Sequence, residues 1–279
     1  MAPDEPSYRR RIPAGIVDSA CASLATFAVG LTAVTVLDDV NRGVYAVYFA
    51  AFLVGVVLPR QLVFAPASIE AVALEPRDHR LAVVSRSLRF GLAPALLGAL
   101  GAPIAYLVTS GYSDASVSAA LAITCAITII LSPMQDFVRQ TLHIAARSWR
   151  AATVSIVQLV VVVAAIGTGL ALDVDRAWIP FGALALANAV SLTVAWLLGH
   201  VGLDVGSTPP MDLRAMLGKG AWLIQTDLAP AAAAFVVAAI IAALASPEDL
   251  GYAEAARVVA QPILVLSAGL SAVLSPRAM

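Results

Sequence analysis

The sequence predicts an all-α protein, a polytopic membrane helical bundle with eight transmembrane helices. Of its 279 residues, 60% are hydrophobic and only 13% are charged, whereas soluble domains contain about 25% charged residues. The apolar residues form eight continuous stretches close to the length of about 20 residues at which a helix crosses a bilayer. Because these stretches are continuous rather than alternating, they do not fit the strands of a β-barrel.

Charges, prolines and short polar turns separate the eight stretches. They cover residues 12–37, 43–59, 90–113, 115–135, 151–172, 177–203, 220–247 and 251–276. We expect Pro133 to end the fourth stretch, because proline removes a helical hydrogen bond. The segments 59–89 and 135–150 interleave apolar residues with arginine. This pattern predicts amphipathic helices on the membrane surface.

The positions of arginine and lysine predict the orientation. Fourteen of the 17 lie in segments that are inside if the N-terminus is cytoplasmic, two lie in outer turns, and Arg257 lies within a span. A bias of this size predicts that both termini are cytoplasmic. We expect the chain to lie in the cytoplasmic (inner) membrane, in contact with membrane lipids. A net charge of −1 gives no basic field for binding nucleic acid.

Two parts of the chain resemble each other on either side of a polar linker. Asp18 precedes Gly43 by 25 residues and Asp227 precedes Gly251 by 24, with an acidic turn between them in both cases. A six-span unit returns the chain to its starting side, so two copies form a parallel repeat. We therefore expect a cytoplasmic tail over 1–13, a six-helix first lobe over 14–201, an interlobe linker with an amphipathic start over 202–216, and the first two helices of an incomplete second lobe over 217–279.

Four ionisable groups lie within the predicted spans: Asp18, Asp227, Glu254 and Arg257. Each costs about 2.5 to 3.5 kcal/mol at the middle of a bilayer, so each needs an explanation. Glu254 and Arg257 are three residues apart and can neutralise each other on one helix face. Alternatively, they line a substrate cavity in which Arg257 offers a bidentate cation to phosphate and Gln261 adds a polar contact one turn further on.

Asp18 and Asp227 have no cationic residue within one turn of their own helices. Each is therefore a candidate for proton or cation coupling, or else it is solvated or pairs with an arginine of another helix, such as Arg60. We expect the helix to break near Pro230, which would free carbonyl groups beside Asp227. The spacing of histidine and cysteine predicts no metal site, and no phosphate-binding loop indicates ATP hydrolysis.

Segments near the last two stretches resemble polysaccharide flippases. The matching segments read MDLRAMLGKGAWLI at 211–224, PEDLGYAEAAR at 247–257 and LSPR at 274–277, with a looser match at 38–46. These flippases belong to the multidrug/oligosaccharidyl-lipid/polysaccharide exporter superfamily, whose members move undecaprenyl-diphosphate-linked sugars or export drugs. The resemblance implies a cationic cavity between two lobes, with Arg257 on a helix that lines it. It also implies twelve or more spans, so a chain with eight is either truncated after the eighth span or a shortened relative.

The resemblance therefore implies a transporter whose substrate is a lipid-linked sugar diphosphate. Two alternatives remain open. Three acidic groups against one arginine within the spans favour a cation-coupled antiporter of drugs or metabolites. The small number of spans favours a non-transporting scaffold that binds glycosyltransferases or a polymerase of the same pathway. None of these functions is enzymatic, and none requires a cofactor or a nucleic acid.

Overall fold

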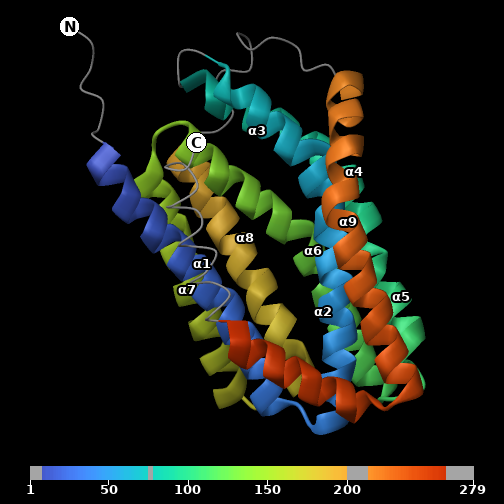
Figure 1. Ribbon diagram of the computed structural model, residues 1–279. Coiled ribbons are helices and arrows are strands. Elements are labelled where there is room, and N and C mark those ends of the chain that lie inside the picture. Colours follow the sequence, from blue (N-terminus) through green and yellow to red (C-terminus); the bar gives the residue numbers. More distant parts are fainter. Residues whose placement is uncertain (1–7, 75–77, 200–212, 262–279) are drawn as a thin grey trace, which may run out of the picture.

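Long helices packed side by side make up the protein (Figure 1). The computed structural model describes residues 8–74, 78–199 and 213–261, and every regular element in these ranges is helical. The helices are α1 (Tyr8–Val36), α2 (Asp39–Pro59), η1 (Arg60–Phe64, a π-helical turn), α3 (Ala65–Val72), α4 (Asp78–Ala99), α5 (Gly101–Thr109), α6 (Ala115–Ile144), α7 (Ser148–Ala171), η2 (Arg176–Trp178, a 3₁₀ turn), α8 (Ile179–Gly199) and α9 (Leu213–Leu244). A last described helix covers residues 247–261.

Seven helical segments are long and apolar enough to cross a membrane, which confirms a polytopic helical bundle. They are Ile12–Val36, Asp39–Val72, Arg80–Thr109, Ala115–Ile144, Ser148–Ala171, Arg176–Gly199 and Arg214–Leu244. They match the first seven predicted stretches in order. The eighth stretch is described only as far as residue 261, where the last described helix lies obliquely across one end of the bundle (Figure 1).

Two boundaries differ from those expected. Helix α1 begins at Tyr8, so the end of the predicted 1–13 tail is helical. The prediction that Pro133 ends the fourth stretch is wrong, because α6 continues through it to Ile144. Buried packing explains this: Phe137, Val138 and Leu142 are at most 2% exposed, and their contacts outweigh one lost backbone hydrogen bond. Residues 135–144 are consequently part of a core helix and not of a surface helix. Most of the predicted linker, 202–216, lies outside the described residues.

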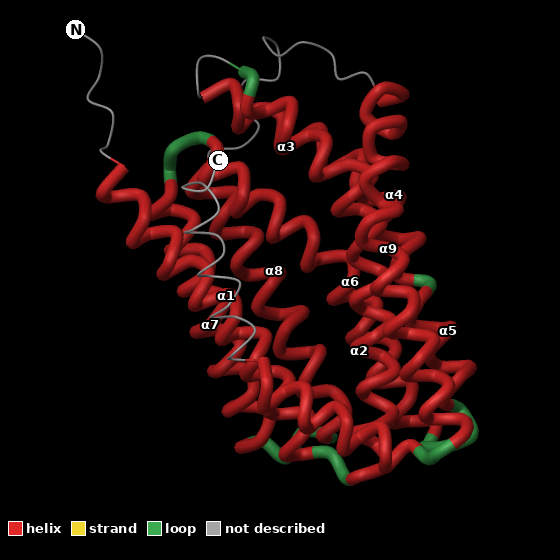
Figure 2. The backbone as a smooth tube through the Cα atoms, viewed as in Figure 1, coloured by secondary structure: helices red, strands yellow, loops and turns green. Residues whose placement is uncertain are grey.

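The third predicted span is two helices. The backbone tube shows the interruption between α4 and α5 as a short loop (Figure 2). Close to the interruption, α4 crosses α2 at two glycines: a Cβ on Gly55 would lie 2.8 Å from the carbonyl oxygen of Gly98, and a Cβ on Gly98 would overlap Gly55. Only glycine allows two helix backbones to approach this closely, as in small-residue contacts between membrane helices.

Helix α6 ends in a left-handed residue that is not glycine. Ala146 has φ of 62°, and the amide of Arg147 donates to the carbonyl of Leu142 at 2.8 Å, which closes a Schellman-type cap. A left-handed alanine costs about 1 kcal/mol. We expect Ala146→Gly to stabilise the protein by about 1 kcal/mol, measured as a higher midpoint of thermal unfolding in detergent. The same change at Ala145, whose φ is −78°, should not stabilise it.

The core lies mainly around α2. An aromatic cluster joins α2 to α8: the rings of Tyr45 and Phe181 are 5.1 Å apart, and those of Phe49 and Phe52 are 5.8 Å apart. Buried residues of α6 and α9 pack against the same cluster. Helix α1 packs instead on α7 and α8 through Ala25 and Val29. Figure 1 shows α1, α7 and α8 on one side of the bundle and α2, α4, α5 and α9 on the other.

Candidate functional site: an arginine at a helix crossing and a buried ion network

Glu254 and Arg257 form a two-bond ion pair on the last described helix, hereafter the Arg257 pair. The Arg257 Nε and Nη2 atoms donate to the Glu254 carboxylate at 2.7 and 2.6 Å. The guanidinium carbon lies 4.1 Å from the ring centre of Phe49 on α2, within the range of a cation–π interaction. Glu254 is 6% exposed. The local pairing allowed by the three-residue spacing is therefore what the structure shows, with an aromatic ring of another helix against the cation.

Gln261 lies one turn beyond Arg257 and faces α1. A Cβ on Gly30 of α1 would lie 3.9 Å from the Gln261 Oε1 atom. This oxygen is buried and has no hydrogen-bond partner within the described part of the chain. The last described helix thus presents Glu254, Arg257 and Gln261 where it crosses α2 and α1.

Asp227 is exposed on α9 and contacts the π-helical turn η1. The Gln61 Nε2 atom donates to the Asp227 carboxylate, and the Thr226 hydroxyl lies 3.4 Å from it. The expected helix break at Pro230 is absent, because α9 is continuous from Leu213 to Leu244. The prediction that freed carbonyl groups adjoin Asp227 is therefore wrong, and its partner is a side-chain amide.

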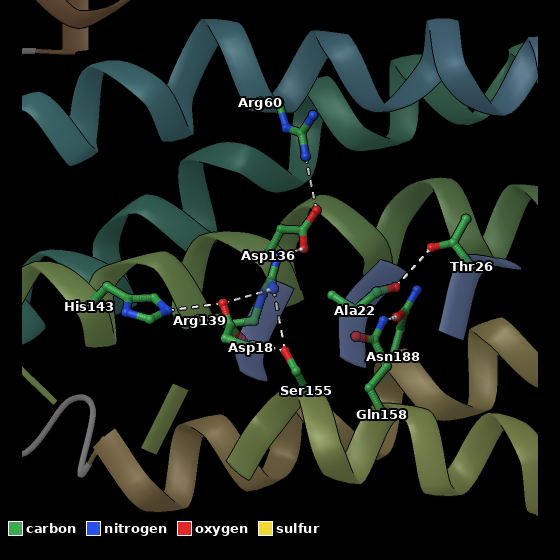
Figure 3. A network of polar contacts seen from close by, with 10 residues as sticks. All are labelled: Asp18, Ala22, Thr26, Arg60, Asp136, Arg139, His143, Ser155, Gln158 and Asn188. Atoms are coloured by element: carbon green, nitrogen blue, oxygen red, sulfur yellow. Dashed lines mark hydrogen bonds and ion pairs between the residues drawn. The ribbon is translucent and has the colours of Figure 1, made fainter. Parts of the chain in front are cut away.

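Asp18 is buried and lies at the centre of a network of polar contacts (Figure 3). One carboxylate oxygen lies 3.1 Å from Arg139 Nη1 and 3.0 Å from His143 Nε2, and the other accepts from the Ser155 hydroxyl at 2.6 Å. Arg139 and His143 belong to α6, and Ser155 belongs to α7. Asp18, which has no cationic residue within one turn on its own helix, therefore contacts an arginine and a histidine of α6.

The contacts continue from Arg139 toward η1. Arg139 Nη2 pairs with Asp136 at 2.9 Å, and the other oxygen of Asp136 pairs with Arg60 at 3.0 Å. Pairing with an arginine of another helix was one of the alternatives for Asp18; that arginine is Arg139, whereas Arg60, the example considered, binds Asp136. We call the whole set the Asp18 network: Asp18, Arg60, Asp136, Arg139, His143 and Ser155. It joins α1, α6, α7 and η1 and carries two cations opposite two carboxylates.

Sequence reasoning missed Asp136, Arg139 and His143 as members of a site. It assigned them to a surface helix beyond Pro133, where charged residues need no buried partner. A signal was present nonetheless, since spacings of three and four residues place all three on one face of a helix. Had the helix been continued through Pro133, this face would have been a candidate partner for Asp18.

The candidate residues fall into separate clusters. Within residues 8–74, 78–199 and 213–261, no ion pair or hydrogen bond joins Asp18 or Asp227 to the Arg257 pair. In the same ranges, no three His, Cys, Asp or Glu side chains are grouped so that they could hold a metal ion. A cavity of about 230 Å³ lies elsewhere, between the ends of α1, α2 and η2, and includes Asn41 and Arg176.

No protein-family model, no curated protein and no solved structure matches the chain.

Proposed function

We propose that this chain is a flippase-type transporter that moves a lipid-linked oligosaccharide or polysaccharide precursor across the cytoplasmic membrane, with both termini in the cytoplasm. The proposal includes eight spans arranged as a six-helix lobe and the beginning of a second. Its main support is the position of Arg257, which is held against a ring of α2 at the crossing of two predicted repeats. Arginine binds phosphate oxygens in the same two-bond geometry in which it binds a carboxylate.

The Arg257 pair suggests how the substrate would be bound and released. Glu254 occupies Nε and Nη2 of the guanidinium, which are the positions that a diphosphate would take. Binding would therefore be an exchange in which substrate oxygens replace the carboxylate and Phe49 continues to hold the guanidinium plane. Because Glu254 is buried, the exchange also requires that its displaced carboxylate gain access to water, since an unpaired buried charge is costly.

Coupling to protons or cations fits Asp227 better than Asp18. Arg139, His143 and Ser155 already neutralise and hydrogen-bond the Asp18 carboxylate, so a further cation there would meet a fixed positive charge. Asp227 is exposed and its bonds come from the neutral groups of Gln61 and Thr226. We therefore propose Asp227 as the coupling residue and the Asp18 network as structural.

Replacing Arg257 tests the proposal. We expect Arg257→Ala to lower polysaccharide export at least about tenfold in a complemented export-deficient strain, since a charged hydrogen bond contributes about 1.5 to 3 kcal/mol. Arg257→Lys should retain part of the activity, because it keeps the charge and loses the two-bond geometry.

Arg89→Ala is the matched control, because Arg89 is an exposed arginine of α4. It should export normally at the same amount of protein in the membrane. Normal export by Arg257→Ala at equal protein level would contradict the assignment of the substrate site.

A further inference from the structure

The cavity between the ends of α1, α2 and η2 has no part in the proposed transport function. Its volume is about 230 Å³, which is smaller than the pockets that take drug-sized ligands. Since liquid water occupies about 30 Å³ per molecule, this volume has room for about eight waters or for one small polar group. The cavity lies at the end of the bundle that carries the α1–α2 turn, the lower end in Figure 1 and the end predicted to be outside.

Charges of both signs line this cavity without pairing with each other. They belong to Asp38, Asp175 and Arg176. Within the described part of the chain, none of the three forms an ion pair, whereas the nearby Asp39 and Arg42 pair at 3.0 Å. A cavity that keeps a cation apart from two carboxylates is complementary to a ligand that itself carries both charges.

Hydrogen bonds to the backbone hold the three charged side chains in place. Asp38 accepts two hydrogen bonds from Asn41, at 2.9 and 2.7 Å, and the first of these caps α2. Asp175 caps η2 through a backbone amide at 3.0 Å, and Arg176 Nη1 donates to the carbonyl of Val36 at 3.3 Å. Each of these groups can make further hydrogen bonds. The charges are therefore positioned before a ligand binds, which lowers the entropic cost of binding.

The cavity lies at the level of the lipid headgroups. Candidate spans end at Val36 and begin at Asp39, so the cavity is where two spans meet their connecting turn. Trp178, next to the cavity residue Ala177, is 41% exposed, and tryptophan at the end of a span is typical of the membrane interface. Buried apolar residues also line the cavity, since Leu37 and Ala177 are 6% and 1% exposed.

From this geometry we infer that the cavity binds a phosphate–ammonium group, presented as the headgroup of a zwitterionic lipid such as phosphatidylethanolamine. Arg176 donates to the phosphate oxygens, for which a guanidinium is well suited. Asp38 and Asp175 accept the N–H groups of the ammonium. This lipid site is independent of the substrate proposed for Arg257.

Binding of single lipids to the purified protein tests the inference. Short-chain lipids would be titrated one at a time into the protein in detergent, and complexes counted by native mass spectrometry. We expect phosphatidylethanolamine to bind at least about tenfold more tightly than phosphatidylglycerol, which lacks the ammonium, and than phosphatidylcholine, whose ammonium has no N–H groups.

Two variants assign the charges. Arg176→Ala should weaken the binding of phosphatidylethanolamine at least about tenfold, because charged hydrogen bonds to the phosphate are lost. Asp175→Asn should reduce the preference over phosphatidylglycerol, because asparagine keeps the cap of η2 and removes the charge. Asp173→Asn is the matched control: Asp173 is an exposed carboxylate of the same turn, it does not line the cavity, and asparagine tolerates its φ of 50°. This variant should bind as the unaltered protein does.

Soluble phosphoethanolamine distinguishes the two sources of the headgroup. Weaker binding than that of the lipid would support the lipid site. Equally tight binding that Arg176→Ala abolishes would support the zwitterion site and contradict its assignment to a lipid. If Arg176→Ala does not fold, Asp175→Asn carries the test. Equal affinities for phosphatidylethanolamine and phosphatidylglycerol, or unchanged binding by a folded Arg176→Ala protein, would overturn the inference.

Discussion

Replacing Asp18 by alanine should destabilise the protein by about 3 kcal/mol, the lower part of the range for breaking a buried ion pair. The loss arises mainly from the partners left behind, because Arg139 and His143 would remain inside the bundle without the carboxylate that they share. Asp136 still contacts Arg139, which keeps the loss from being larger. The measurement is the free energy of unfolding in detergent, or the midpoint of thermal unfolding.

Asp227→Ala is the control for this experiment, since Asp227 is also a carboxylate within a predicted span but is exposed. We expect it to change stability by less than about 1 kcal/mol. The double variant Asp18→Leu with Arg139→Met should be more stable than Asp18→Ala, because replacing both charges leaves neither uncompensated. Equal losses for Asp18→Ala and Asp227→Ala would contradict the structural role of the Asp18 network.

Replacing Gly98 by alanine should destabilise the protein by about 1 to 3 kcal/mol, the usual cost of overpacking. The added methyl group would meet the backbone of Gly55 and force α4 away from α2. Helix propensity acts in the opposite direction, since alanine is favoured over glycine within a helix by about 1 kcal/mol. A net loss of stability would therefore show that the backbone contact between α4 and α2 costs more than the helix propensity of alanine gains.

Gly167→Ala separates these two effects, because its methyl group would meet open space. It should keep the stability unchanged or raise it, opposite in sign to Gly98→Ala in the same thermal unfolding assay. A gain in stability for both variants would show that α2 and α4 are not in backbone contact.

The sequence was sufficient to predict the helical class and the order of the seven candidate spans, because the apolar stretches are long and continuous. Two of its errors lay at prolines. Pro133 and Pro230 both lie inside helices, and at Pro133 the loss of one hydrogen bond is outweighed by packing. This packing involves residues far apart in the chain, so it cannot be predicted from the residues that neighbour the proline in the sequence.

The site was predictable to the extent that its contacts were local. The three-residue spacing of Glu254 and Arg257 was enough to suggest their ion pair, whereas the ring of Phe49 comes from another helix more than 200 residues earlier. The repeat indicated equivalent segments, but the one-residue difference between the two aspartates already implied different faces. The basic partners of Asp18, Arg139 and His143, could be found only by following α6 beyond Pro133.

The long separation between Asp18 and Arg139 has a consequence for synthesis. These residues are 121 positions apart, so a ribosome adding 5 to 20 residues per second completes the second about 6 to 24 s after the first. Until Arg139 has been synthesised, the Asp18 carboxylate of the first helix lacks its arginine partner. We expect nascent chains that end before α6 to be held by the insertion machinery and degraded, and those that extend past Arg139 to be released into the lipid.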